Sequence, residues 1–228
     1  MKHIPQTKEE LQKLVKDLSI NLGDIDTSKI TDMSYLFHKT QRTDFSGIEK
    51  WNVSRVENMF AMFAYAKSFN ADISKWDVSR VEKMNRMFYG AISFNQDISK
   101  WDVSRVENMN SMFYQAESFN QPIGDWDVSN VENMHDMFAF AKSFNADISS
   151  WDVSKVWNME NMFSGAISFN ADISKWNVSK VRNMEGMFAG ATSFNQDISY
   201  WDVSSVEYID DETKDLIGNG CSNTRTMR

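Results

Sequence analysis

The chain has 228 residues, of which 42% are hydrophobic and 25% charged, and its formal net charge is −8. This composition is typical of a globular protein, and the negative charge argues against nucleic acid as the main partner, because phosphate binding needs a basic surface. The one cysteine, Cys221, excludes an internal disulfide framework and a multi-cysteine metal site, and no apolar run approaches the ~18 residues of a membrane span.

The N-terminal segment, residues 1–24, predicts a capping helix. Residues 7–10 have the spacing of a capping box, in which the first and last side chains satisfy free backbone N–H groups. Leu11, Val15 and Leu18 then recur at helical spacing, which gives the helix one apolar face. We expect this face to cover the open edge of the first repeat that follows.

A tandem repeat occupies residues 25–209. Seven tryptophans, from Trp51 to Trp201, are 25 residues apart, and six units read approximately W-[DN]-V-S-x-V-x-N-M-x-x-M-F-x-x-A-x-S-F-N-x-D-I-S-x. Twelve of the 15 Met and twelve of the 16 Phe fall in two columns each, and a degenerate unit begins at Ile25. Such a period predicts a solenoid of about seven units plus a partial last one.

Two hydrophobic periodicities alternate within each unit. In one unit Trp76 and Val78 alternate as in a strand, and Val81, Met84 and Met87 then recur as on one face of a short helix. The S-x-x-E motif between the two segments has the pattern of a capping box. We therefore predict an α/β fold: a leucine-rich-repeat-like solenoid with a short parallel strand and a short helix in each 25-residue repeat.

The C-terminal end departs from the repeat. Tyr208 and Ile209 replace the usual Asn-Met pair, and the segment from Ser204 to about Ile217 predicts a modified final helix. We expect residues 210–228 to form a C-terminal cap and a frayed tail.

The repeat resembles that of the BspA-like leucine-rich-repeat surface proteins of bacteria. The resemblance rests on W-D-V-S-x-V-x-N-M-x-x-M-F-x-x-A-x-S-F-N and covers residues 25 to about 209. It implies a leucine-rich-repeat-like solenoid, a bacterial surface or secreted location, and a role in adhesion or host-protein binding, without catalytic residues. Residues 1–6 show no apolar secretory segment, which leaves a cytoplasmic location open.

An acidic column follows the repeated tryptophans and is expected to point onto the inner sheet face. Stacked carboxylates ~5 Å apart repel one another, so their repetition needs a cause. The alternatives are local hydrogen bonds to a serine, backbone N–H or lysine, a ladder that binds a basic partner surface, and a calcium site. A flanking column varies in identity, as binding surfaces of solenoids do. The candidate partner-binding residues are Lys75, Asp77, Lys100, Asp102, Asp125, Asp127, Asp152 and Tyr200.

Three further sets of side chains stand outside this surface. The column of Asn70 and Asn95 predicts a buried ladder that satisfies backbone groups, with substrate contact as the alternative, and the column of Asp72 predicts turn caps. Aromatic residues outside the repeat columns mark either an interface or packing between neighbouring helices. They are Phe60, Tyr65, Tyr89, Tyr114, Phe140 and Trp157.

The sequence contains no phosphate-binding glycine motif, no H-E-x-x-H motif, and no serine or cysteine with a plausible histidine partner. We therefore predict a protein without enzymatic activity, cofactor or metal. We expect a protein-binding or adhesion scaffold whose partner is a host or cell-surface protein, with no nucleic acid and no membrane span. The alternative is a structural or self-assembling module without a dedicated ligand.

Overall fold

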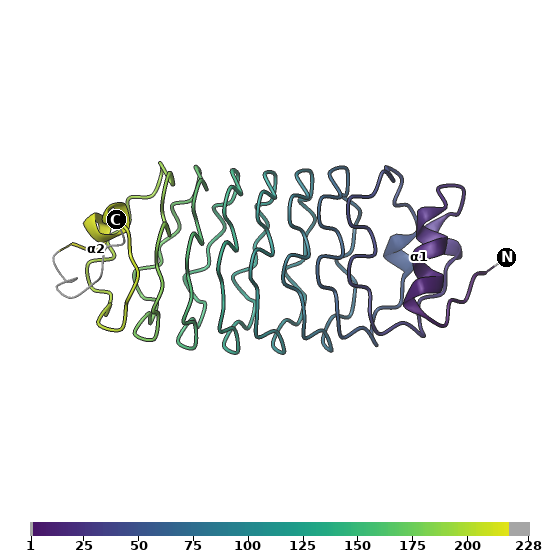
Figure 1. Cartoon of the computed structure of the whole chain (residues 1–228), viewed down its shortest axis with the longest axis horizontal. Coiled ribbons are helices and arrows are strands. Elements are labelled where there is room, and N and C mark those ends of the chain that lie inside the picture. Colours follow the sequence, from purple (N-terminus) through teal and green to yellow (C-terminus); the bar gives the residue numbers. More distant parts are fainter. Residues whose placement is uncertain (1, 219–228) are drawn as a thin grey trace.

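The computed structural model describes residues 2–218, in which the chain winds into a stack of coils, one coil for each repeat (Figure 1). Helix α1 (Lys8–Lys16) lies at the N-terminal end of the stack and helix α2 (Asp211–Ile217) at the other end. No helix in this part of the chain is long and apolar enough to cross a membrane. Cys221 and the predicted frayed tail lie outside the described residues.

Helix α1 begins as predicted. The Thr7 side chain accepts a hydrogen bond from Glu10 N at 3.2 Å, and the Glu10 carboxylate accepts one from Gln6 N at 2.7 Å. The helix ends earlier than its apolar pattern indicated, at Lys16, so Leu18 is 60% exposed instead of continuing the apolar face.

A buried arginine holds α1 on the first coil. The Arg42 guanidinium donates hydrogen bonds to the carbonyl oxygens of Val15, Asp17 and Ile20 at 3.2, 2.7 and 3.3 Å. Carbonyls at and beyond the end of a helix have no partner within it, so Arg42 supplies one. The N-terminal end of the stack is therefore closed by a helix that is bonded in place.

The C-terminal end is closed in a similar way, although α2 is shorter than predicted. It begins at Asp211 and not at Ser204, and Asp210 is its N-cap, accepting a hydrogen bond from Thr213 N at 3.0 Å. Ile209 is 3% exposed and occupies the core position that methionine holds in the preceding coils.

The predicted strand in each repeat is wrong. Successive coils meet in single parallel bridges, such as Asn58 with Lys83 and Lys83 with Asn108, and residues 2–218 contain no continuous strand or sheet. The alternation at Trp76 correctly places its side chain inside, but its backbone N–H bonds Ile73 O within the same coil. The expected inner sheet face therefore does not exist.

The predicted helix in each repeat is also wrong. Along residues 84–91 the backbone N–H groups alternate between two kinds of partner: Met87 donates to Met84 O in its own coil, whereas Phe88 donates to Met112 O of the next coil at 2.9 Å. A helix would direct every N–H to the carbonyl four residues earlier. The three- and four-residue spacing of apolar side chains thus arises here from consecutive turns.

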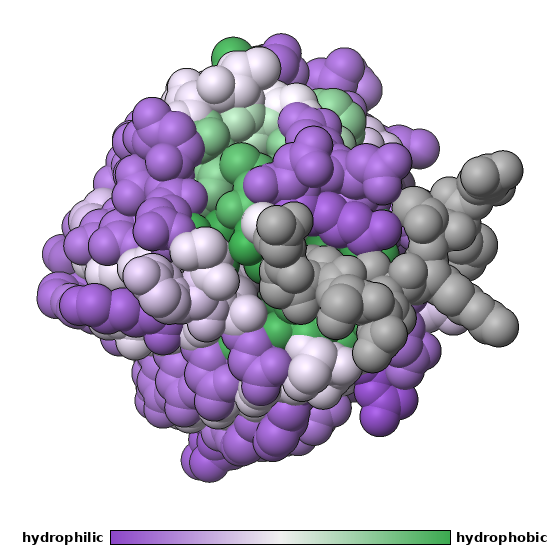
Figure 2. Space-filling model, turned by 90° about the vertical axis from the view of Figure 1, so that its left-hand side faces the viewer, coloured by the Kyte–Doolittle hydropathy of each residue, from purple (hydrophilic) through white to green (hydrophobic). Residues whose placement is uncertain are grey.

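The core is a set of columns that run the length of the stack. The rings of Phe63 and Phe88 stack at 5.8 Å between neighbouring coils, and Phe63 also stacks on Phe69 at 3.8 Å. Each repeat tryptophan reaches back one coil, as Trp76 Nε1 does to Ile48 O at 3.2 Å. Figure 2, which faces the C-terminal end, shows apolar surface towards the middle of the cross-section and polar residues at the rim.

Two short 3-10 helices replace the corner turns of the earliest coils. They are η1 (Leu22–Asp24) and η2 (Ile48–Lys50), and they contact each other. In η2 the N-cap Gly47 has φ 92°, and a side chain there would collide with the backbone of Gly23. Glycine at this position allows the first two coils to approach as closely as the later ones.

Candidate functional site

The predicted partner-binding residues lie at one corner of the stack, on successive coils, and all are exposed. We call this set, from Lys75 to Asp152 together with Tyr200, the Asp–Lys edge. Lys100 Nζ and Asp125 Oδ2 are 3.9 Å apart on neighbouring coils, and Tyr200 is 87% exposed near the C-terminal end. The edge is a row of turns and not the strand surface that was expected.

Local hydrogen bonds account for the repeated aspartates of the edge. Asp77 Oδ1 accepts from the backbone N and hydroxyl of Ser79 at 3.2 and 2.6 Å, and Asp102 accepts from Ser104 in the same way. The serine hydrogen bonds lower the pKa of Asp77. The S-x-x-E motif is therefore not a helix cap, because its serine is bound to the aspartate before it. Among residues 2–218 no three His, Cys, Asp or Glu side chains come together as a metal-binding group.

The asparagine ladder forms as predicted but is not buried. Asn95 N donates to Asn70 Oδ1 at 2.9 Å, and Asn120 N donates to Asn95 Oδ1 at 2.9 Å, with all three side chains exposed. The second acidic column caps turns as predicted, since Asp72 Oδ1 accepts from Ser74 N at 2.9 Å. The asparagine column thus links successive coils, whereas the acidic column fixes a turn within each coil.

A different face of the stack carries the residues that change most from repeat to repeat. We call it the variable face, and it is formed in each coil by the equivalents of Asn85, Arg86, Tyr89 and Gly90. The first of these columns comprises Ser34, Phe60, Asn85, Asn110, His135, Glu160 and Glu185. The second comprises Tyr35, Ala61, Arg86, Ser111, Asp136, Asn161 and Gly186.

The other two columns of the variable face are as diverse. The Tyr89 column comprises His38, Ala64, Tyr89, Tyr114, Ala139, Ser164 and Ala189. The Gly90 column comprises Lys39, Tyr65, Gly90, Gln115, Phe140, Gly165 and Gly190. The core columns, by contrast, repeat one residue type through nearly every coil, so the variation on this face is not set by packing inside the stack.

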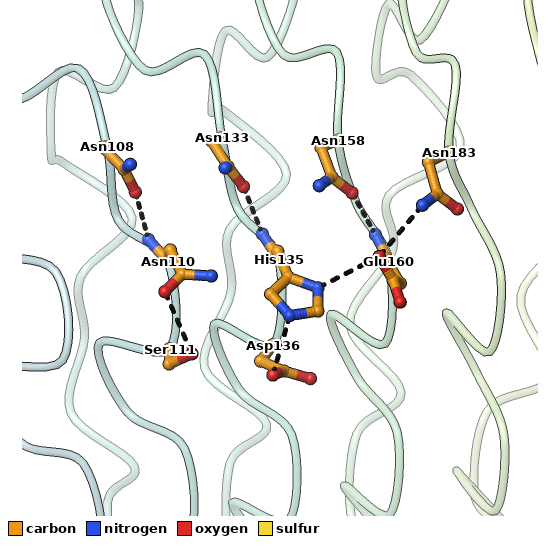
Figure 3. A network of polar contacts seen from close by, with 9 residues as sticks. All are labelled: Asn108, Asn110, Ser111, Asn133, His135, Asp136, Asn158, Glu160 and Asn183. Atoms are coloured by element: carbon orange, nitrogen blue, oxygen red, sulfur yellow. Dashed lines mark hydrogen bonds and ion pairs between the residues drawn. The ribbon is translucent and has the colours of Figure 1, made fainter.

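An asparagine turn leads the chain onto the variable face in most coils. Asn133 Oδ1 accepts from His135 N at 2.9 Å, and Asn158 Oδ1 accepts from Glu160 N at 3.0 Å (Figure 3). The asparagine oxygen fixes the turn by accepting from the backbone N–H two residues later, and the side chain of that later residue takes no part in the bond. The side chain at the equivalent of Asn85 is thus free to differ.

Polar contacts connect neighbouring coils on this face. His135 Nε2 lies 3.0 Å from Asp136 Oδ2, and His135 Nδ1 lies 3.5 Å from Glu160 Oε2 on the next coil (Figure 3). Glu160 also accepts from Asn183 Nδ2 at 3.0 Å, one coil further on. The hydrogen bond to Asp136 raises the pKa of His135, which favours the charged imidazole beside these two carboxylates.

Two columns of the face have a left-handed backbone, which normally favours glycine. Tyr65 and Phe140 have φ 58°, in the column where Gly90 and Gly165 have φ 65° and 64°. A residue with a Cβ is less stable in this conformation by about 1–2 kcal/mol. The stack thus carries large side chains at positions where glycine would be more stable.

Aromatic rings form a continuous row across the variable face. The ring centroids of Tyr65 and Tyr89 are 5.0 Å apart, those of Tyr89 and Tyr114 are 4.4 Å apart, and those of Tyr114 and Phe140 are 5.6 Å apart. Burial raises the pKa of Tyr89, with Tyr65 and Tyr114 adding to the effect, so its phenol stays protonated. Phe140 remains 40% exposed.

A groove of about 200 Å³ opens beside this row at the N-terminal half of the face. Lys39 Nζ lies 5.5 Å from the ring centroid of Tyr65 at the same half. Burial lowers the pKa of His38, so this part of the lining is neutral at neutral pH. Side chains that line the groove include Tyr35, His38, Phe60, Tyr65, Arg86 and Tyr89.

The structure shows where the six aromatic residues outside the repeat columns lie. The alternative that they pack between helices is wrong, because the coils that carry them, residues 51–209, contain no helix. Five of them lie on the variable face, and Trp157 lies outside its four columns and is 44% exposed. The polar members of the face, such as Arg86 and Glu160, were not identified from the sequence. The sequence did contain a signal for them: the repeats are nearly identical, yet the residues in these columns change from repeat to repeat although packing of the core does not require it.

The two halves of the variable face differ in character. The N-terminal half carries most of the aromatic rings with Lys39 and Arg86, whereas the C-terminal half carries Glu160 and Glu185 among glycine, alanine and serine, together with His135, Asp136 and Phe140 near the centre. The outermost coils of the face are therefore bulky and basic at one end and small and acidic at the other.

A family model described as Mycoplasma protein of unknown function, DUF285, matches residues 8–126 and 117–216. The two matches together span α1 and all the coils, and they confirm the predicted tandem repeat. No curated protein and no solved structure matches the chain.

Proposed function

The chain belongs to the DUF285 repeat family, and on that premise we propose that it is a non-enzymatic protein-binding scaffold whose variable face contacts the partner. The observation that carries the proposal is the concentration of changing, partly exposed and often strained side chains on one face. Repeat stacks present extended surfaces of this kind, on which side chains can differ while the scaffold stays the same.

The size of the face favours a macromolecular partner. Seven coils at ~4.8 Å spacing give a strip of roughly 34 Å. The groove beside the aromatic row, about 200 Å³, is smaller than the ~300–1,000 Å³ of typical small-molecule pockets. A larger hollow of about 980 Å³, which Phe60 and Asn85 border, is lined almost entirely by polar and charged residues, whereas small-molecule pockets are mostly apolar. Aromatic rings and arginine are enriched at protein interfaces, and here they occupy the centre and one end of the strip.

We also propose the kind of partner that the scaffold binds. The resemblance to BspA-like surface proteins supports a host or cell-surface protein and a role in adhesion. The Asp–Lys edge is the alternative surface through which a protein-binding scaffold could contact its partner. Its aspartates already have a structural role, which is why we favour the variable face.

Site-specific photo-crosslinking distinguishes the two surfaces. A photoreactive phenylalanine analogue at Tyr89 or Tyr114 tests the variable face, and the same analogue at Lys75 or Tyr200 tests the Asp–Lys edge. We expect adducts with a defined protein from the first pair only. Adducts from the edge alone would move the function to that surface, and adducts from neither pair would contradict the proposal.

A paired substitution tests the edge without disturbing its turns. Asp102→Asn with Asp127→Asn removes two charges but keeps the oxygen that accepts from serine, and Asn52 and Asn177 already occupy this column. If the variable face binds the partner, affinity in this double variant stays within about twofold, as expected for exposed charges outside the contact. A loss of tenfold or more would support the edge instead.

A further inference from the structure

The two halves of the variable face are complementary in size. In the Tyr89 column, Tyr89 and Tyr114 occupy the third and fourth coils, counted from that of Tyr35, whereas Ala139 and Ser164 occupy the fifth and sixth. The neighbouring column repeats part of this pattern, with Tyr65 in the second coil and glycine in the seventh.

The halves are also complementary in charge. Arg86 is exposed and has no ion-pair partner among residues 2–218. The C-terminal half carries the exposed Glu185 and also Glu160, whose side chain is 34% exposed while it contacts His135 and Asn183 of its own chain. One molecule cannot bring these ends together, because they lie at opposite ends of the same strip.

From this complementarity, and resting on the proposed function of the face, we propose that its partner is a second copy of this chain, packed face to face and antiparallel. A rotation of 180° about an axis across the face, between the fourth and fifth coils, sets each column against itself in reverse order. Tyr114 then lies opposite Ala139, Tyr89 opposite Ser164, and Tyr65 opposite Gly190. Bulky side chains meet small ones in these three pairs, while Gln115 comes opposite Phe140 next to the axis.

The same rotation pairs charges and apolar side chains at the margin of the face. Arg86 comes opposite the coil of Glu160. In the flanking column, Ile92 and Ile167, which are 37% and 46% exposed, come opposite each other. Because the arrangement has twofold symmetry, every one of these contacts occurs twice.

Other arrangements of two copies lack this match. A parallel pairing would set each half against its own equivalent, so that Glu160 and Glu185 would face acidic side chains and rings would face rings. End-to-end stacking is opposed at the N-terminal end, where Arg42 bonds α1 over the first coil. The antiparallel pair is the arrangement that joins unlike halves.

Sedimentation across a concentration series, at low and high ionic strength, tests the inference directly. We expect a reversible dimer that weakens as salt screens its charges. Ser164→Tyr probes the contact sterically, because its column already accommodates Tyr89 and Tyr114, while the new ring would meet a tyrosine of the second copy. The dimer dissociation constant should rise by about tenfold or more, since overpacked contacts are destabilising. The thermal midpoint should be unchanged at concentrations where the native protein is monomeric.

Ser150→Tyr is the matched control for this substitution. It makes the same change on the Asp–Lys edge, in a column where Tyr200 is native, and should leave dimerisation unchanged. Equal weakening by both variants would show an effect of tyrosine itself and would overturn the proposed interface.

A charge exchange tests the antiparallel register. Arg86→Glu and Glu160→Arg should each weaken the dimer by about tenfold, and the double variant should return to within about threefold of the native protein, because the pair is restored in reverse. Thermal midpoints of all three variants verify the fold. Weakening without restoration would contradict this register.

The outcomes separate this inference from the proposed function. A chain that stays monomeric at every concentration and salt overturns the dimer. If photo-crosslinking from Tyr89 then captures a different protein, the variable face remains a binding surface. If it captures none, both are wrong.

Discussion

Several single residues on the variable face have a backbone conformation that is strained for any residue other than glycine. Gln115 has φ 54°, and Phe140 in the same column has φ 58°, whereas Gly165 and Gly190 adopt this conformation without strain. Positions with a left-handed backbone occur twice in each coil of the face, so the strain is spread along the stack.

Relief of this strain should be measurable at Gln115. We expect Gln115→Gly to raise the free energy of unfolding by up to about 1 kcal/mol, because glycine adopts φ 54° without a Cβ clash. Urea titration measures the change. Glu107→Gly is the control, at an exposed position without positive φ, and should lose about 0.5–1 kcal/mol.

The aspartates that cap turns should make the protein sensitive to acid. Hydrogen bonds from the serine two residues later lower the pKa of Asp77, Asp127 and Asp152 below the ordinary 3.8. The stability they contribute is complete well above 3.8 and is lost as the pH falls through the lowered values. Thermal midpoints should therefore drop steeply in this acid range.

A neutral variant of the same three positions provides the comparison. Asp77→Asn with Asp127→Asn and Asp152→Asn keeps the acceptor oxygens but removes the titrating groups. Its thermal midpoint should depend less on pH below 3.8 than that of the native protein. An identical acid profile would show that other groups control the transition.

Each coil depends on its neighbours more than on its own hydrogen bonds. Trp126 Nε1 donates to Ile98 O of the preceding coil at 3.0 Å, and its side chain is 3% exposed. We expect Trp126→Phe to lower the free energy of unfolding by about 2 kcal/mol, since a buried carbonyl loses its partner. Trp157→Phe, at a 44% exposed position, should change it by less than about 0.5 kcal/mol.

Within each repeat, the sequence pattern predicted which side chains are buried but not which backbone groups are hydrogen-bonded to each other. The columns of Trp76, Met84 and Phe88 are buried as their spacing predicted. The same spacing suits a helix and a series of turns, because it records which side chains face inward and not which carbonyl each N–H reaches. The strand and helix were therefore wrong although the core was right.

The candidate site was predictable only in parts for the same reason. Tyr89 and Phe140 stood out as aromatic residues outside the core columns. Their common face depends on left-handed turns that local propensity does not predict for tyrosine or phenylalanine. The residues of the Asp–Lys edge were correctly predicted to be exposed, but they were wrongly predicted to lie on a strand.

At the scale of the whole molecule, the stack should tolerate the loss of one repeat. Deleting residues 101–125 joins Lys100 to Trp126 and recreates the Lys-Trp junction of other coils. We expect a folded stack with one coil fewer and a smaller urea dependence of unfolding, since less surface is exposed. Deleting residues 101–112 breaks the period and should prevent cooperative folding, which circular dichroism and urea titration would show.

The tryptophan bonds that reach back one coil also determine how the protein responds to force. Each indole joins only neighbouring coils, so tension applied between the two ends loads the junctions one after another. Each released repeat adds about 90 Å of contour length, from 25 residues at roughly 3.6 Å each. Stretched in an optical trap, the chain should lengthen in a staircase of similar small ruptures, and so behave as an extensible tether.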